Sequence, residues 1–470
     1  MRVRRSVVVR CCAVAVLGFS CEAVAQTAQQ TAQQTQAPAP VQASSPGPAP
    51  GPAPLGVNGQ FAPWLQVRGE YRTRIEGFTG GGFSDSNDDA YWLGRFRLNA
   101  TVRPNTSMRF FIQTQDARAF DRTTGGLATP LRDTFDLRQA YGEFGTTTMV
   151  RVGRQELAFG EERLIGGVNW LNNARSFDAG RLTIKRKGVQ VDAFAASVVT
   201  IQPDAFDKSG GGNALYGTYV ALSTLVPKQA VEPFFFWRQS RGLAAELGGT
   251  ATLHQATTGL RMAGKLPASF DYSGEAALQT GSVGPDSISA WASHSVIGKT
   301  FDGASLKPRL FAEFNHASGD ANAKDGTRGT FDQLYPTGHD KYGLADQVGW
   351  RNINHARTGV ELKPTSKWQV SGGYHSYWLA SATDALYSAG GAVVARSSAG
   401  TAGRYVGQEV DVQTTYIYSS QLQVAGGFAH LIPGTFLKNT TQGHAYSYPF
   451  VMITYVFLGE KPAIGGRKAQ

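Results

Sequence analysis

Residues 65–75 alternate strictly between two kinds of side chain. The odd positions hold apolar residues, Tyr, Gly or Thr, while every even position holds Gln, Arg or Glu. Successive side chains of an extended strand point to opposite faces, so this period of two predicts a strand with one apolar and one charged face. Residues 91–103 repeat the pattern, with Trp92 and Phe96 on one face and Arg95 and Arg97 on the other.

The alternation recurs along the chain and predicts eighteen strands. They cover roughly residues 62–75, 91–103, 107–117, 134–144, 148–157, 177–185, 189–199, 214–225, 230–240, 253–265, 270–280, 288–300, 308–317, 353–363, 367–378, 403–417, 422–431 and 446–457. After the first 25 residues there is no apolar run of about 18 residues, which argues against a membrane-spanning helix.

The predicted connections alternate in length: eight short turns, such as 104–106, follow the even strands, and nine long polar loops, such as 318–352, follow the odd ones. Outer-membrane barrels have short periplasmic turns and long extracellular loops, and an even strand number brings both ends to one side. The predicted fold class is therefore all-β, a transmembrane antiparallel β-barrel of eighteen strands in the bacterial outer membrane. Closure also removes the exposed edges that an open sheet would have.

The two ends of the chain have other compositions. Residues 1–25 combine four arginines, an apolar run and Ala-Val-Ala, which predicts a cleaved signal peptide, although a lipoprotein signal at Cys21 is an alternative. Residues 26–58 are rich in Gln, Ala and Pro and are expected to form a disordered periplasmic tether. The barrel would then occupy residues 59–457, followed by a polar tail at 458–470.

Charge and cysteine content narrow the chemistry further. All three cysteines lie within the predicted signal peptide, so we expect no disulfide in the exported chain. The formal net charge is +10, and +7 without residues 1–25. A basic chain favours anionic lipid or an anionic cargo.

Charged residues recur on the predicted inner face of the strands. A carboxylated polymer needs repeated, exchangeable cationic contacts, and guanidinium groups match carboxylate geometry. The alternatives are an ordinary water-filled lumen and, for residues 154–163, an ion-pair network that stiffens the wall. The pore-lining residues that we expect are Arg68, Arg72, Arg74, Arg95, Arg97, Arg109, Arg151, Arg154, Arg181 and Arg357, with Glu70, Glu143, Asp192, Glu409 and Asp411 orienting them.

Signatures of catalysis or metal binding are weak. The eight histidines are scattered, and the sequence has no H-E-x-x-H or G-x-S-x-G motif. A serine beside a histidine, as at His375 and Ser376, leaves a barrel hydrolase as a minor alternative. We expect no enzymatic activity, no cofactor and no bound metal.

Several segments together resemble the alginate-export family of outer-membrane barrels. They are residues 152–166, 113–118, 136–141, 335–339, 348–352 and 407–411, with Asn169-Trp170 and Arg175-Ser176-Phe177-Asp178. The resemblance implies an eighteen-stranded barrel and passage of a polyuronate through an arginine-rich constriction.

We therefore expect an anion-preferring channel for an acidic polysaccharide. The alternatives are a porin for uptake of small anionic nutrients and, from another class, a barrel enzyme or an adhesin. The expected partners are outer-membrane lipid and lipopolysaccharide, the anionic polysaccharide or small anions, and periplasmic export proteins, but no nucleic acid.

Overall fold

The computed structural model describes residues 62–124 and 131–457. The predicted signal peptide (1–25), tether (26–58) and polar tail (458–470) lie outside these described residues and stay predictions. None of the helices in the described part combines the length and the apolar character needed to cross a membrane.

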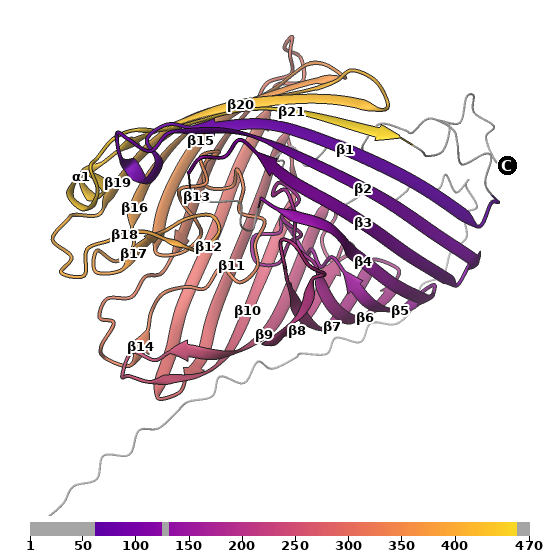
Figure 1. Cartoon of the computed structure of the whole chain (residues 1–470), viewed down its shortest axis with the longest axis horizontal. Coiled ribbons are helices and arrows are strands. Elements are labelled where there is room, and N and C mark those ends of the chain that lie inside the picture. The colour runs from indigo at the N-terminus through magenta and orange to yellow at the C-terminus, as the bar shows by residue number, and fades with distance from the viewer. Residues whose placement is uncertain (1–61, 125–130, 458–470) are drawn as a thin grey trace, which may run out of the picture. The chain divides into compact units, whose positions relative to one another are not determined.

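The described residues form strands almost throughout (Figure 1). The strands are β1 Leu65–Phe78, β2 Asp89–Asn105, β3 Met108–Phe120, β4 Asp133–Gly145, β5 Thr148–Gln155, β6 Phe177–Arg186, β7 Val189–Thr200, β8 Lys208–Leu222, β9 Gln229–Ala244, β10 Thr250–Leu266, β11 Phe270–Val283, β12 Asp286–Thr300, β13 Arg309–Ala317, β14 Thr327–Arg328, β15 Ile353–Thr365, β16 Trp368–Leu379, β17 Ala385–Tyr387, β18 Val393–Arg396, β19 Tyr405–Ile417, β20 Leu422–Pro433 and β21 Tyr446–Phe457. Two short helices, η2 Gly81–Phe83 and α1 Thr435–Thr440, lie in loops.

The strands close into one antiparallel barrel. The large sheet has 19 strands, of which the two-residue β14 only touches the edge of β12, so eighteen strands make the wall. The first and last wall strands pair with each other, with Ile75 opposite Val451. The prediction of an eighteen-stranded barrel is confirmed, and because the first strand meets the last, the wall has no edge to pair with another chain.

The two faces of the wall differ as the period of two predicts. On β2, Trp92 and Phe96 are exposed on the outer face, whereas Arg95 and Arg97 are buried on the inner face. On β19, Val410 is exposed in the same way. Exposed apolar side chains around a barrel are stable in lipid, so this outer face identifies the membrane-embedded surface.

The loops follow the predicted asymmetry only in part. Strands β11 and β12 run on until only Gly284 and Pro285 separate them, whereas at the opposite end of the barrel β12 and β13 are joined by residues 301–308. Gly284 has φ +58°, which a tight turn requires and glycine adopts without strain. The expectation that long and short connections alternate without exception is therefore wrong, because β9 to β12 extend beyond their predicted ends into what looked like loops.

Two long connections fold into the barrel, residues 156–176 between β5 and β6 and residues 318–352 between β13 and β15, and we call them the inner loops. They pair with each other: the Gly166 amide donates to the Tyr335 carbonyl at 2.9 Å, and the Tyr335 amide donates to the Leu164 carbonyl at 2.8 Å. Ile165 and Tyr335 form a parallel bridge. The two loops thus make one body inside the wall.

The apolar core of the protein lies inside the barrel, where the inner loops contact the wall. Phe159 stacks on Phe194 of β7 and on Tyr219 of β8, with ring centroids 5.3 and 5.0 Å apart. Phe234 and Phe236 of β9 continue this cluster. The inner face of β7 to β9 is therefore less polar than the alternation suggests, because these strands anchor a folded loop rather than facing water.

Candidate channel constriction

Arginines of the paired strands β1 and β2 lie side by side on the inner face of the wall. The register of β1 and β2 places Arg72 opposite Arg95 and Glu70 opposite Arg97. The Arg95 guanidinium forms an ion pair with Glu70 at 2.8 Å. Two arginines directly opposite each other repel, so the site needs acceptors beyond this one acid.

The first inner loop supplies those acceptors as backbone carbonyls. Arg72 donates to the carbonyl oxygens of Asn169, Trp170 and Leu171 at 2.8, 3.0 and 3.0 Å. Arg95 donates to Asn169 and Leu171 at 2.9 and 3.3 Å. Three consecutive carbonyls pointing at one cationic patch fix the loop against the wall, and each bond from a charged donor is worth about 1.5–3 kcal/mol.

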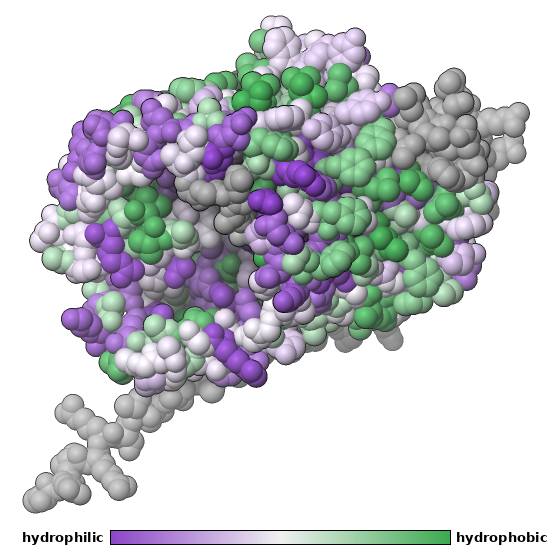
Figure 2. Space-filling view, in the orientation of Figure 1, coloured by the Kyte–Doolittle hydropathy of each residue, from purple (hydrophilic) through white to green (hydrophobic). Residues whose placement is uncertain are grey.

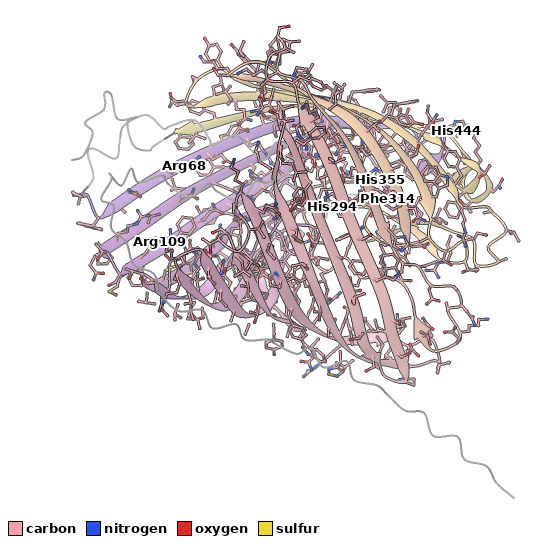
Figure 3. All side chains as sticks on the ribbon, turned by 180° about the vertical axis from the view of Figure 1, so that it is seen from behind. Arg68, Arg109, His294, Phe314, His355 and His444 are labelled. Carbon is pink, nitrogen blue, oxygen red and sulfur yellow. The ribbon has the colours of Figure 1, made fainter. Side chains whose placement is uncertain are left out.

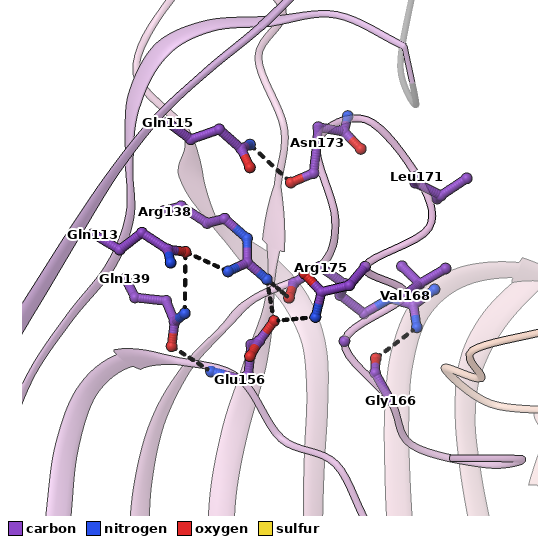
Figure 4. A network of polar contacts seen from close by, with 12 residues as sticks. Gln113, Gln115, Arg138, Gln139, Glu156, Gly166, Val168, Leu171, Asn173 and Arg175 are labelled. Atoms are coloured by element: carbon purple, nitrogen blue, oxygen red, sulfur yellow. Dashed lines mark hydrogen bonds and ion pairs between the residues drawn. The ribbon is translucent and has the colours of Figure 1, made fainter. Parts of the chain in front are cut away.

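A polar network extends from this patch across β3 and β4 (Figure 4). The Nε–H of Arg97 donates to Gln115, and one amino group of the same guanidinium donates to the Asn169 side chain at 2.9 Å. Arg138 forms an ion pair with Glu156. Burial alone would raise the pKa of Glu156, but Arg138 and Arg97 outweigh it and hold the pKa at about 2, so this carboxylate stays charged.

Trp170 at the tip of the loop is held between a histidine and an arginine side chain. Its ring stacks on His339 of the second inner loop at 3.8 Å, with an interplanar angle of 3°. The Arg74 guanidinium lies over the Trp170 ring, 3.9 Å from the ring centroid. Trp170 therefore joins the wall, the first inner loop and the second inner loop in one stack.

A second anchor ties the inner loops to the opposite wall. Arg163 of the first inner loop forms ion pairs with Glu161 at 3.2 Å and with Glu313 of β13 at 3.1 Å. Glu161 also pairs with Arg261 of β10 at 3.0 Å. The ion-pair network expected within residues 154–163 therefore connects a loop to the wall rather than stiffening the wall itself.

A directed chain of hydrogen bonds runs through buried side chains beside this anchor. Its members are Arg163, His294, Asn315, His355, His375 and Asp411, and successive polar atoms lie 2.8–3.1 Å apart. Arginine can only donate, so the His294 Nε2 atom accepts and its Nδ1–H donates to Asn315. By the same logic His355 accepts at Nδ1 and donates through Nε2–H to His375, whose own Nε2 atom lies 3.0 Å from the Asp411 carboxylate. Figure 3 shows His294 and His355 in the middle of the wall.

The other candidate residues are spread over the inner face. Arg68 is exposed, and Figure 3 shows it on the same side of the barrel as Arg109. Arg109 and Arg151 share Glu143 at 2.9 and 2.6 Å. The remaining pairs are Arg181 with Asp192 at 2.9 Å and Arg357 with Glu313 at 3.7 Å, while Glu409 and Asp411 accept the amides of Ala345 and Leu344 at 3.0 and 3.3 Å.

Arg154 does not share this face. It is three residues from Arg151 in an unbroken register, so it takes the outward direction of the exposed Val150 and Val152. It pairs with Asp178 at 2.9 Å. The prediction that Arg154 lines the pore is therefore wrong, because its side chain lies on the outer side of the wall.

The sequence does not predict most of the contacts that hold the inner loops. The motif around Asn169 and Trp170 is visible in the sequence, but the acceptors there are backbone carbonyls. Every residue has a carbonyl, so residue type does not predict them. His339 ends the segment 335–339 that carries the resemblance, but nothing in the sequence indicates that it stacks on Trp170. The face of the molecule shown in Figure 2 is hollowed, and hydrophilic residues line the hollow.

Comparison with known proteins agrees with this architecture. Among curated proteins, no relative matches the chain. Solved structures are similar in fold: Pseudomonas aeruginosa OpdO has a TM-score of 0.56 at 11% identity, covering 84% of this chain and 97% of that one. A BenF-like porin from Pseudomonas fluorescens Pf-5 gives 0.58 at 10%, covering 84% and 99%. Pseudomonas aeruginosa OccK2 (OpdF), solved in complex with glucuronate, gives 0.55 at 9%, covering 84% and 96%.

The fold is thus that of a porin-like barrel of the bacterial outer membrane. The sequence profile described as alginate export matches residues 63–451, which is nearly the whole described barrel. The chain belongs to the alginate export family.

Proposed function

We propose that this protein is an outer-membrane channel that prefers anions and passes an acidic polysaccharide built of uronate units. The observation that carries the proposal is the patch of Arg72, Arg95 and Arg97 at the tip of the first inner loop. Cargo that passes beside the tip of this loop meets guanidinium groups whose field reaches about 8–10 Å at physiological salt.

One of these groups has bonding capacity left. The second amino group of Arg97, Nη2, is buried and has no hydrogen-bond partner among the described residues. A buried guanidinium nitrogen without an acceptor is costly, and a passing carboxylate would satisfy it. Arg97 is therefore the contact at which we expect the cargo to pause.

Ion selectivity in planar bilayers tests the proposal. The Arg68→Gln/Arg97→Gln variant removes two inner-face charges and leaves the Arg72 and Arg95 bonds to the loop. We expect an anion-preferring wild type, and a zero-current potential in a KCl gradient that moves toward cation preference in the variant. Arg118→Gln is the matched control, because Arg118 pairs with Asp116 on the outer face and is half exposed. A wild type without anion preference, or a variant with unchanged selectivity, would overturn the proposal.

Uptake of small sugar acids is the second candidate, and the packing of the inner loops favours it. The two loops pair with each other and with both sides of the wall, which leaves a long polymer less room than a monomer. The glucuronate bound to OccK2 (OpdF) is a small acid of this type. Swelling of proteoliposomes separates the candidates: a polymer channel admits oligouronates of increasing length, whereas an uptake porin admits glucuronate and excludes the longer chains.

A further inference from the structure

Three aspartates from two separate segments meet near the extracellular end of the wall. Asp133 and Asp136 lie at the start of β4, and Asp207 ends the loop 201–207 between β7 and β8. One carboxylate oxygen of each lies within 4.8 Å of the other two. Strands β5 and β6 separate these segments in the sheet, so the loop reaches over them to bring its aspartate to β4.

Backbone contacts fix this arrangement. The Thr134 amide and hydroxyl both donate to the Pro203 carbonyl, at 3.0 and 3.1 Å. The Asp207 amide donates to the Asp136 carboxylate. The fold thus holds the aspartates together, in part through the Asp136 carboxylate itself.

Neighbouring cations neutralise the three charges only in part. Arg154 lies 3.9 Å from Asp136, but it donates to Asp178 at 2.9 Å. Arg132 is paired with Asp204.

A second observation points to a ligand. Asp133 is only 2% exposed, and its Oδ2 accepts from the Gln115 amide at 3.1 Å. Its Oδ1 is buried and has no hydrogen-bond partner among the described residues. A buried carboxylate oxygen without a donor is unfavourable, and a cation shared with the two other aspartates would satisfy it.

We propose that Asp133, Asp136 and Asp207 bind one Ca²⁺ ion, which fastens the loop 201–207 to β4. Ca²⁺ takes oxygen ligands at about 2.3–2.6 Å, so ligands on one ion lie up to about 5 Å apart, as these carboxylates do. Mg²⁺ demands about 2.0–2.1 Å and near-octahedral geometry, and Zn²⁺ prefers nitrogen or sulfur ligands. Water completes the coordination shell.

One side chain connects the aspartate site to the constriction. Gln115, which contacts Asp133, also donates to the Asn173 carbonyl of the first inner loop at 2.8 Å and accepts from Arg97 at 2.7 Å. A bound ion therefore holds Asp133 in the position from which it supports Gln115.

Calorimetric titration of the full exported chain with CaCl₂ tests the site, in detergent and without lipopolysaccharide, which itself binds divalent cations. We expect one saturable site per chain with a dissociation constant on the order of 10⁻⁴–10⁻³ M, as in extracellular modules. Asp207→Asn should weaken binding at least about tenfold, since it removes one of three charged ligands. Asp204→Asn, in the same loop, should leave binding unchanged, and MgCl₂ should bind more weakly.

Folding is checked for each variant by slower gel migration after boiling. Because Asp207 lies in a loop, its replacement tests the site without altering a wall strand. No saturable Ca²⁺ binding by the wild type, equal binding by Asp207→Asn, or equal weakening by Asp204→Asn would each overturn the proposal.

Discussion

Arg72 and Arg95 give the sharpest test of how the first inner loop is held. The Asn169 carbonyl accepts from Arg72 at 2.8 Å and from Arg95 at 2.9 Å, and the Leu171 carbonyl accepts from the same pair at 3.0 and 3.3 Å. Either arginine alone still satisfies both carbonyls. Replacing both by Met leaves two acceptors without these donors, which costs about 1–3 kcal/mol for each one left unsatisfied.

The expected effects follow from this sharing. Arg72→Met should lower the free energy of local loop opening by about 1.5–3 kcal/mol, the value of a hydrogen bond to a charged group. The double variant should exceed the sum of the two single variants by at least about 1 kcal/mol, because it also orphans the carbonyls. Repulsion between the facing arginines acts in the same direction, since either single replacement already relieves it.

Hydrogen exchange of protected amides in the loop measures these energies. The Leu171 amide donates to Val168 at 3.0 Å and the Arg175 amide donates to Gly167 at 2.7 Å, so both exchange only when the loop opens. A change of 1–2 kcal/mol corresponds to about 5- to 30-fold faster exchange. Arg118→Met, on the outer face, is the control. If the two replacements are additive within about 0.3–0.5 kcal/mol, the carbonyls are not shared as the geometry requires.

Three further outcomes are expected. Trp170→Ala should increase single-channel conductance in bilayers, because it removes the ring between Arg74 and His339, and an unchanged conductance would show that Trp170 does not narrow the path. Burial raises the folded-state pKa of Asp207 to about 6 from a usual value of about 3.9, so its stabilising contribution is complete below about pH 4 and is lost as the pH rises through 6. Without divalent cations, its amide should therefore be better protected at pH 4 than at pH 7, after correction for intrinsic exchange, and Asp207→Asn should reduce this dependence. Deleting residues 26–58 should leave a barrel that still migrates faster on a gel before boiling than after it, and loss of that shift would mean that the segment takes part in the fold.

The wall could be predicted because apolar and polar residues alternate along most of its strands. A period of two sets which face meets lipid, and it predicts that Arg72, Arg95 and Arg97 lie on the inner face, where the structure has them. The same period puts Arg154 on the outer face, since it lies three residues from Arg151, so its place among the pore-lining residues does not follow from the pattern.

The inner loops could not be predicted in the same way. Their partners are carbonyl oxygens at residues 169–171, and a carbonyl is present at every position of the chain. Aromatic residues on the inner face, such as Phe194 and Phe236, mark where a loop docks, but in the sequence they are indistinguishable from lipid-facing residues of a shifted register. That the arginines line a conducting path stays a prediction, which the selectivity measurement addresses.

The pairing of the inner loops through Tyr335 has a consequence for how the aperture varies. Residues 156–176 and 318–352 leave the wall at different strands, yet backbone hydrogen bonds join them at its centre. A movement of one loop must either carry the other with it or break these bonds. The aperture is thus a cooperative property of two distant segments, so its openings are expected as discrete steps of current rather than a continuous range, and an insertion in one loop should change the occupancy of states governed by the other.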